Sequence, residues 1–144
     1  NYRGKWEMIH NEIVQHFPYV EEKLYDEYDL IPMDKLDKNA LVQIPTIYYA
    51  QGDNIEPYRK YHIVPKLHNM GYRSIHYTVC FESVYIEIQV RTIALDFWAN
   101  LEHQIHYKKD IEDEKLIRSE LKRCADEIAS LDLSFQTIKD RIEG

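Results

Sequence analysis

Residues 74–91 constrain the fold more than any other stretch, because apolar and polar residues alternate there in two runs joined by Glu82 and Ser83. The apolar residues are the odd-numbered ones from Ile75 to Phe81 and the even-numbered ones from Val84 to Val90. A period of two predicts strands with one apolar face. Two such strands separated by two residues predict a β-hairpin, although Glu-Ser is not a pair that favours a tight primed turn.

The polar face of this hairpin is our first candidate for a binding site. If Phe81 pairs with Val84, three polar pairs follow by counting back along the strands: Thr78 with Glu87, His76 with Gln89, and Ser74 with Arg91. One face then gathers a carboxylate, an imidazole, an amide and a guanidinium. From alternation alone, an ordinary amphipathic hairpin with a solvated face explains the pattern equally well.

A helix is predicted directly after the second strand. Thr92 is a good N-cap residue, and apolar residues then recur every four positions, at Ile93, Phe97, Leu101 and Ile105. Asp96, Asn100 and His103 lie on a different face of that helix. Because the helix leaves from the strand that carries Glu87, its first turn can bring Asp96 to the polar face of the hairpin.

The remainder of the chain predicts a single domain, residues 1–144, with helices on both sides of this centre. Residues 1–30 are expected to form N-terminal helices, the first over residues 3–16 and ended by Pro18. Residues 58–64 alternate weakly and predict a further strand, followed by a loop at 65–71. The fold class is therefore α+β, an α/β two-layer arrangement in which helices flank a mixed β-sheet with a central antiparallel hairpin.

The C-terminal tail, residues 111–143, shows apolar residues at alternating steps of three and four from Ile117 to Ile142, which is a heptad seam. Asp132 and Ser134 are candidate break points in this helix. Most such seams dock a helix onto its own domain. The alternative is contact with another protomer, giving a homo-oligomer, or with an antitoxin-like partner protein.

Composition narrows the classes of partner. The net charge of −7 and the pI near 5.5 exclude a global basic surface for nucleic acid, although small basic patches occur at residues 58–60 and 108–109. Cys80 and Cys124 have no metal or redox spacing. No apolar run is long enough to span a membrane and no secretory leader is visible, so we expect a cytoplasmic protein.

Three motifs identify a family. The segments GYRSIH, EIQVRT and ALDFWANLEH, the last followed by YKK, resemble in order and spacing the synthetase domain of the RelA/SpoT homologues. The likeness covers roughly Tyr61 to Lys109 and is greatest to the small alarmone synthetases, including their toxin branch. Residues 58–109 are thus expected to form the core that binds the acceptor substrate.

The resemblance implies transfer of the β,γ-pyrophosphate of ATP to a ribose 3′-hydroxyl, with Mg²⁺ as cofactor. Glu87 matches the acidic residue that holds Mg²⁺ and orients or deprotonates the hydroxyl. Tyr72 matches the aromatic residue that stacks on the acceptor's base, and Asp96 the carboxylate that reads its edge and favours guanine. The other positions implied to bind the acceptor are Lys66, Arg73, His76, Gln89, Arg91 and His103. The alternatives are a Tyr72 packed into the core and an Arg91 that buttresses Glu87.

Two elements of the family pattern have no counterpart here, namely the basic segment that clamps ATP and the strand with the first metal-binding Asp. The ATP-binding segment is therefore not identifiable in this sequence. Three functions follow as alternatives: a synthetase that makes (p)ppGpp from ATP and GDP or GTP, a toxin that pyrophosphorylates the 3′-CCA end of tRNA and so blocks translation, and a non-catalytic nucleotide-binding or interaction domain. The acidic net charge weighs against tRNA, because tRNA binding depends on phosphate contacts.

Overall fold

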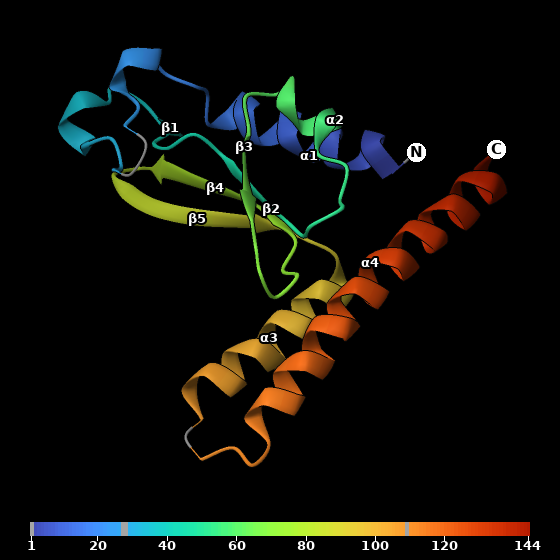
Figure 1. Cartoon of the computed structure of the whole chain (residues 1–144). Coiled ribbons are helices and arrows are strands. Elements are labelled where there is room, and N and C mark those ends of the chain that lie inside the picture. The colour runs from blue at the N-terminus through green and yellow to red at the C-terminus, as the bar shows by residue number, and fades with distance from the viewer. Residues whose placement is uncertain (1, 27–28, 109) are drawn as a thin grey trace.

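The computed structural model describes residues 2–26, 29–108 and 110–144, with only the backbone for residues 2–5. A mixed sheet carries helices on one face, and a long antiparallel helix pair extends from one end of it (Figure 1). The elements in chain order are α1 (Tyr2–His16), η1 (Glu22–Leu24), η2 (Met33–Lys35), β1 (Ala40–Leu41), β2 (Thr46–Tyr49), α2 (Glu56–Arg59), β3 (Val64–Leu67), β4 (Ser74–Phe81), β5 (Val84–Val90), α3 (Ile93–Tyr107) and α4 (Glu114–Glu143). The predicted α+β class is confirmed.

The predicted hairpin forms the centre of the sheet. Strands β4 and β5 pair antiparallel in the expected register, with Phe81 opposite Val84, Thr78 opposite Glu87 and His76 opposite Gln89. Strand β5 occupies one edge of β4, and β1 and β2 share the other edge as two antiparallel segments. Strand β3 then pairs parallel with β2, which makes the sheet mixed.

The turn between β4 and β5 is tighter than its residues favour. Glu82 and Ser83 have φ angles of 47° and 67°, so both adopt the left-handed conformation of a primed two-residue turn. Neither residue is a glycine or an asparagine, and the hairpin therefore holds its turn at a conformational cost. The register of the long β4–β5 ladder prevails over the preference of the two turn residues.

One apolar core lies between the sheet and α1, which covers the odd-numbered face of β4. Trp6 of α1 packs with Leu41, Ile75 and Tyr77, and the buried His10 forms a 2.8 Å hydrogen bond through Nδ1 with the Tyr77 hydroxyl. Burial lowers the pKa of His10 and raises that of Tyr77, since each is removed from water in its neutral form. This core fixes the face of the hairpin that points away from its polar residues.

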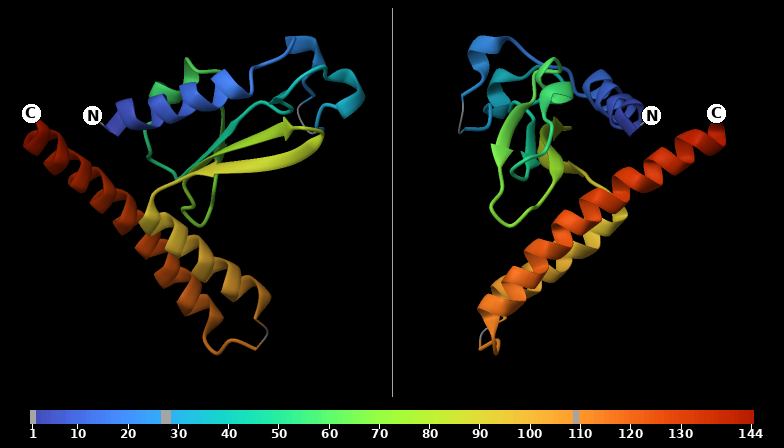
Figure 2. Two further views of the ribbon diagram at one scale, coloured as in Figure 1. Left: turned by 180° about the vertical axis from the view of Figure 1, so that it is seen from behind. Right: turned by 45° about the vertical axis from the view of Figure 1, so that its right-hand side comes forward.

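A second core joins the helix pair to the sheet. Trp98 of α3 and Leu121 and Ala125 of α4 pack around Tyr72, and the Trp98 indole donates a 2.7 Å hydrogen bond to the Leu121 carbonyl. The predicted N-cap is confirmed, because the Thr92 hydroxyl accepts from the Leu95 amide at 3.2 Å. As Figure 2 shows, α3 and α4 run side by side, and α4 continues past the start of α3.

Two local expectations were wrong. Residues 58–64 are not a strand, since α2 ends at Arg59 and strand β3 begins only at Val64; β3 then continues to Leu67, within the stretch 65–71 that was expected to be a loop. Helix α4 is continuous through Asp132 and Ser134, and Asp132 instead accepts a 2.6 Å hydrogen bond from the Thr92 hydroxyl. On α3 the residues that are buried are Leu95 and Trp98, so Ile93, Phe97 and Leu101 of the apolar stripe are exposed, and only Ile105 of that stripe packs against the second core.

Candidate functional site

A cavity of about 670 Å³ opens on the polar side of the hairpin, between the sheet and α3. Five of the predicted site residues line it: Tyr72, His76, Gln89, Arg91 and His103. Its other walls come from β2, the β3–β4 loop and the two long helices, through Tyr48, His68, Ala99, Asn100, Glu102, His106, Tyr107 and Arg118. The hairpin, rather than a loop, therefore supplies the floor of the site, which gives it rigid positions.

The Tyr72 hydroxyl is the centre of the polar contacts in this cavity. Arg91 Nη1 donates to it at 2.6 Å, and His76 Nε2 lies 3.0 Å away. Its distance to Gln89 Oε1 is 3.4 Å, so that contact is the weakest of the three. Tyr72 is 9% exposed, and its ring centre lies 6.2 Å from that of Trp98, at an interplanar angle of 27°.

Tyr72 is a largely buried part of the cavity wall, so its ring is not freely exposed for stacking. Of the two interpretations of this residue, packing into the core and contact with a base, the structure shows the packing directly. The residue also lines the cavity, so a base that contacts its ring must lie inside the cavity.

The partner of Glu87 is His76. The two side chains are 2.8 Å apart, from Nδ1 to Oε1, and the Glu87 carboxylate is half exposed. Burial lowers the pKa of His76, while the nearby Glu87 partly opposes that shift. Arg91 binds Tyr72 and Asp96 and makes no contact with Glu87 among the described interactions, so the buttressing that was considered for Arg91 belongs to His76.

These contacts have one consistent hydrogen-bond direction when His76 is neutral. Because Glu87 accepts, the proton of His76 lies on Nδ1 and Nε2 is an acceptor. The Tyr72 hydroxyl then donates to Nε2, and its oxygen accepts from Arg91. The chain of donors runs from Arg91 through Tyr72 and His76 to Glu87, and it leaves the carboxylate of Glu87 as the acceptor at the open end.

Asp96 and Lys66 lie beside the cavity but do not line it. The Oδ1 atom of Asp96 accepts a 3.0 Å hydrogen bond from Arg91 Nε and forms an ion pair with Arg91 Nη2 at 2.7 Å. Lys66 is exposed on β3, with its ammonium group 5.8 Å from the centre of the Tyr48 ring. Each therefore touches a residue of the cavity wall.

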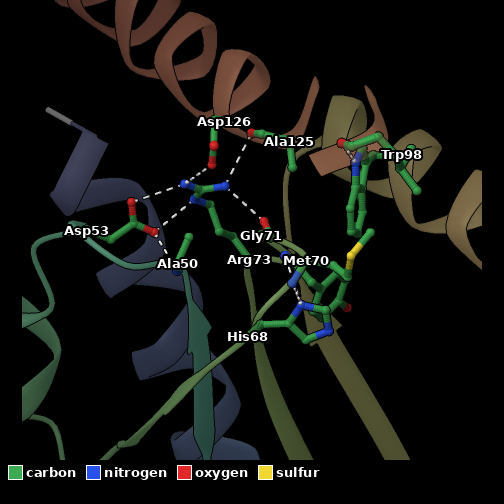
Figure 3. A network of polar contacts seen from close by, with 11 residues as sticks. Ala50, Asp53, His68, Met70, Gly71, Arg73, Trp98, Ala125 and Asp126 are labelled. Atoms are coloured by element: carbon green, nitrogen blue, oxygen red, sulfur yellow. Dashed lines mark hydrogen bonds and ion pairs between the residues drawn. The ribbon is translucent and has the colours of Figure 1, made fainter. Parts of the chain in front are cut away.

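Arg73 is the one predicted acceptor residue that the structure directs elsewhere. Its guanidinium binds both carboxylate oxygens of Asp53, at 2.8 and 3.2 Å, and reaches Asp126 at 3.3 Å and the carbonyls of Gly71 and Ala125 (Figure 3). Arg73 does not line the cavity beside Tyr72. Its contacts tie the segment just before β4 to α4 and to Asp53.

Sequence reasoning missed the residues that shape the loop before Tyr72. His68 accepts hydrogen bonds at Nδ1 from the amides of Met70 and Tyr72, both at 3.2 Å (Figure 3). Gly71 has a φ of 87°, and a Cβ there would lie 3.0 Å from Ala125 Cβ, so the loop requires a glycine at this point. A histidine three residues before a glycine was the only signal in the sequence, and it is a weak one.

Glu87 is the candidate metal ligand among these residues. No cluster of three or more His, Cys, Asp or Glu side chains that could hold a metal ion occurs in the described part of the chain. Glu87 fits the role of a single oxygen ligand, and a Mg²⁺ ion there would take its other ligands from substrate phosphates and water. None of the described helices is long and apolar enough to cross a membrane.

Comparison with known proteins places the chain in a family. Residues 37–112 match the model described as the region found in RelA / SpoT proteins. The GTP pyrophosphokinases YwaC and YjbM of Bacillus subtilis (strain 168) are 41% and 31% identical to this chain over 81 residues, which is 51% of the chain. The chain spans only 39% and 38% of the length of these two relatives.

A solved structure also matches, that of the small alarmone synthetase 1 from Bacillus subtilis bound to its product pppGpp. It is 32% identical, with a TM-score of 0.44, and the match covers 54% of this chain and 43% of that one. The family model covers the hairpin, the cavity floor and all of α3. The chain therefore belongs to the RelA/SpoT family.

Proposed function

We propose that this chain carries the acceptor side of a pyrophosphokinase that transfers the β,γ-pyrophosphate of ATP to the ribose 3′-hydroxyl of GDP or GTP, making (p)ppGpp. The observation that supports this most directly is the cavity lined by Tyr72, His76, Gln89 and Arg91; Glu87 does not line it but contacts the lining residue His76. Two relatives that share this region are GTP pyrophosphokinases. The cavity has the size range of sites that enclose a small molecule.

Glu87 is the proposed catalytic residue. Attack of a ribose hydroxyl on phosphorus requires a group that orients the hydroxyl and accepts its proton. A half-exposed carboxylate at the acceptor end of a hydrogen-bond chain can do both, because His76 holds its Oε1 atom without giving up a proton. A Mg²⁺ ion bound through Glu87 would neutralise charge on the phosphates when present.

Asp96 is the proposed guanine reader. A carboxylate can accept from the ring N–H and the amino group of guanine together, whereas adenine has no ring N–H to donate. Arg91 holds Asp96 through Oδ1 beside the cavity wall. Lys66 and His103 are proposed to contact the phosphates of the acceptor, and the cytoplasm remains the predicted location.

The residues that would bind ATP, the pyrophosphate donor, are not identified in this chain. Both carboxylate oxygens of Asp53 bind Arg73, and Oδ2 also accepts from the Ala50 amide. A side chain so fully engaged is a poor metal ligand. Acceptor binding and pyrophosphate transfer must therefore be measured separately.

The experiment offers γ-labelled ATP with GDP, GTP, ATP or deacylated tRNA in parallel, and measures GDP binding without ATP by calorimetry. Label in GDP or GTP supports the proposal, and label in tRNA shows the toxin activity instead. Binding of GDP without transfer to any acceptor shows a nucleotide-binding domain. Glu87→Gln is expected to abolish transfer while GDP still binds, and transfer at the wild-type rate in this variant would overturn the assignment of Glu87.

A further inference from the structure

His68 lines the cavity and uses only one of its two ring nitrogens in hydrogen bonds to the protein. Its Nδ1 atom accepts from the backbone amides of Met70 and Tyr72 (Figure 3). An amide can only donate, so Nδ1 carries no proton, and in the neutral ring the proton lies on Nε2. No residue in the described part of the chain accepts a hydrogen bond from this Nε2 atom. The ring therefore presents a donor that has a fixed place and no protein partner.

The surroundings of His68 hold the ring in this neutral form. Burial lowers the pKa of the imidazole, Glu102 of α3 opposes part of that shift, and Lys66 of β3 adds to it. Protonation would also place a hydrogen on Nδ1 and break both hydrogen bonds to the loop amides. At neutral pH His68 is thus a neutral hydrogen-bond donor rather than a cation.

The backbone fixes the position of this donor. The His68 amide donates a 2.8 Å hydrogen bond to the Tyr49 carbonyl, which continues the β2–β3 ladder by one residue. The His68 carbonyl accepts from the Gly71 amide at 3.3 Å. Because backbone and ring are both held, Nε2 needs no rearrangement before it binds a ligand.

His68 and His76 lie against the same two tyrosines of the cavity wall. The ring centre of Tyr48 is 4.7 Å from that of His76 and 6.3 Å from that of His68. The ring centre of Tyr72 is 5.7 Å and 5.5 Å from the same two imidazoles. A nucleotide whose ribose lies at the pair formed by His76 and Glu87 can therefore reach His68 with another of its groups.

The neighbours of His68 favour a phosphate as that group. Lys66 precedes His68 by two residues, so the two side chains lie on the same face of β3. Strand β3 is the edge strand of the sheet, and Val64 and Leu67 are each 49% exposed. A charged phosphate chain loses least solvation at such an edge, and the Lys66 ammonium group supplies a positive charge there.

We propose that His68 donates a hydrogen bond from Nε2 to the 5′-phosphate chain of the acceptor nucleotide, an inference that rests on the proposed function. The same ring holds the loop that carries Tyr72, through the two amides that Nδ1 accepts from. His68 is thus both a binding residue for the phosphates and a positioning residue for Tyr72. GDP and GTP can use this contact, whereas guanosine cannot.

Two substitutions separate the two roles of the ring. In His68→Asn the side-chain oxygen can take the place of Nδ1 and accept from the loop amides, but no atom reaches the position of Nε2. In His68→Gln the side-chain nitrogen can reach the position of Nε2 and donate, but the loop amides lose their acceptor. The experiment measures the dissociation constants for GDP and for guanosine by calorimetry, without ATP.

We expect His68→Asn to raise the dissociation constant for GDP by roughly tenfold, as for the loss of a hydrogen bond to a charged group. The dissociation constant for guanosine should stay unchanged in this variant. His68→Gln should weaken both ligands by the same factor, because it loosens the loop and keeps the donor. His16→Asn is the matched control, since His16 is exposed on α1 and lies outside the cavity, and it should change neither constant.

Equal weakening of GDP and guanosine by His68→Asn would overturn the proposal, since the ring would then act only through the loop. No weakening of either ligand would overturn it as well, and would leave the proposed function intact as long as the wild-type chain binds GDP. A wild-type chain that binds no GDP would overturn both. Urea unfolding checks that the variants fold; if His68→Asn does not, a loss of the preference for GDP over guanosine in His68→Gln contradicts the donor role.

Discussion

Replacing Tyr72 by phenylalanine removes the single oxygen atom to which Arg91, His76 and Gln89 converge, at 2.6, 3.0 and 3.4 Å. The ring stays, so its packing against Trp98, Leu121 and Ala125 is preserved. The change therefore isolates the hydrogen bonds from the apolar contacts.

The magnitude follows from what each partner keeps. A hydrogen bond to a charged group contributes about 1.5–3 kcal/mol and a neutral one about 0.5–1.5 kcal/mol. Arg91 retains Asp96, and His76 retains Glu87, while water in the open cavity can replace the lost oxygen. We expect a loss of about 1–2 kcal/mol in the free energy of unfolding, well below the roughly 3–5 kcal/mol for removing a buried aromatic ring.

Urea unfolding followed by fluorescence or circular dichroism measures this loss. Tyr48→Phe is the matched control, because the Tyr48 ring lies 5.8 Å from that of Tyr72 but its hydroxyl makes no hydrogen bond to any described residue. If Tyr72→Phe is no more destabilising than Tyr48→Phe, the hydrogen-bond chain from Arg91 to Glu87 does not hold the site. A loss above about 3 kcal/mol would refute the claim that the partners remain satisfied.

Three further outcomes are expected. Ser83→Gly should raise the free energy of unfolding by about 0.5–1 kcal/mol, because glycine adopts the φ of 67° at this turn without strain; an unchanged urea midpoint would contradict this. Arg73→Ala should cost about 2–3 kcal/mol in urea unfolding, since it removes the donor to both carboxylate oxygens of Asp53 and to the carbonyls of Gly71 and Ala125. GDP binding should change little, because Arg73 lies outside the cavity. Burial lowers the pKa of His10 below its usual 6.5, so protons bind preferentially to the unfolded chain. The free energy of unfolding should therefore fall as the pH drops through 6.5 towards the lowered pKa. The variant His10→Gln, whose side chain does not titrate, should show a shallower fall in the free energy of unfolding between about pH 7.5 and 5.5.

The hairpin was predictable because strand periodicity is a local property. Each side chain of β4 and β5 points to the face that its odd or even position dictates, so pairing Phe81 with Val84 fixed the pairs as far back as Ile75 with Val90. The N-cap at Thr92 was predictable for a similar reason, since a cap needs only a hydroxyl three residues before an amide. The roles of Glu87, Tyr72 and Asp96 came from the family resemblance and remain predictions.

Short elements near residues 56–67 were not predictable from their own residues. Strand β3 forms because Val64 to Leu67 lie alongside β2, and that partner is an earlier segment whose position depends on β4. A weak alternation over 58–64 could not reveal it. Likewise, Arg73 and His76 belong to one motif, but only the folded structure shows that they have different partners. Arg73 binds Asp53, whereas His76 binds Glu87.

The sequence by itself determined the hairpin register, the helix start at Thr92 and the heptad seam of the tail, because each depends on residues close together in the chain. Its motifs also determined the family. The tertiary structure alone decided which apolar stripes are buried. Trp98 and Leu121 are enclosed because α3 and α4 meet at the sheet, whereas Phe97 and Phe135 carry an equally regular pattern and remain exposed. Periodicity defines an apolar face, but burial depends on whether another element lies opposite it, and that is a property of the folded molecule.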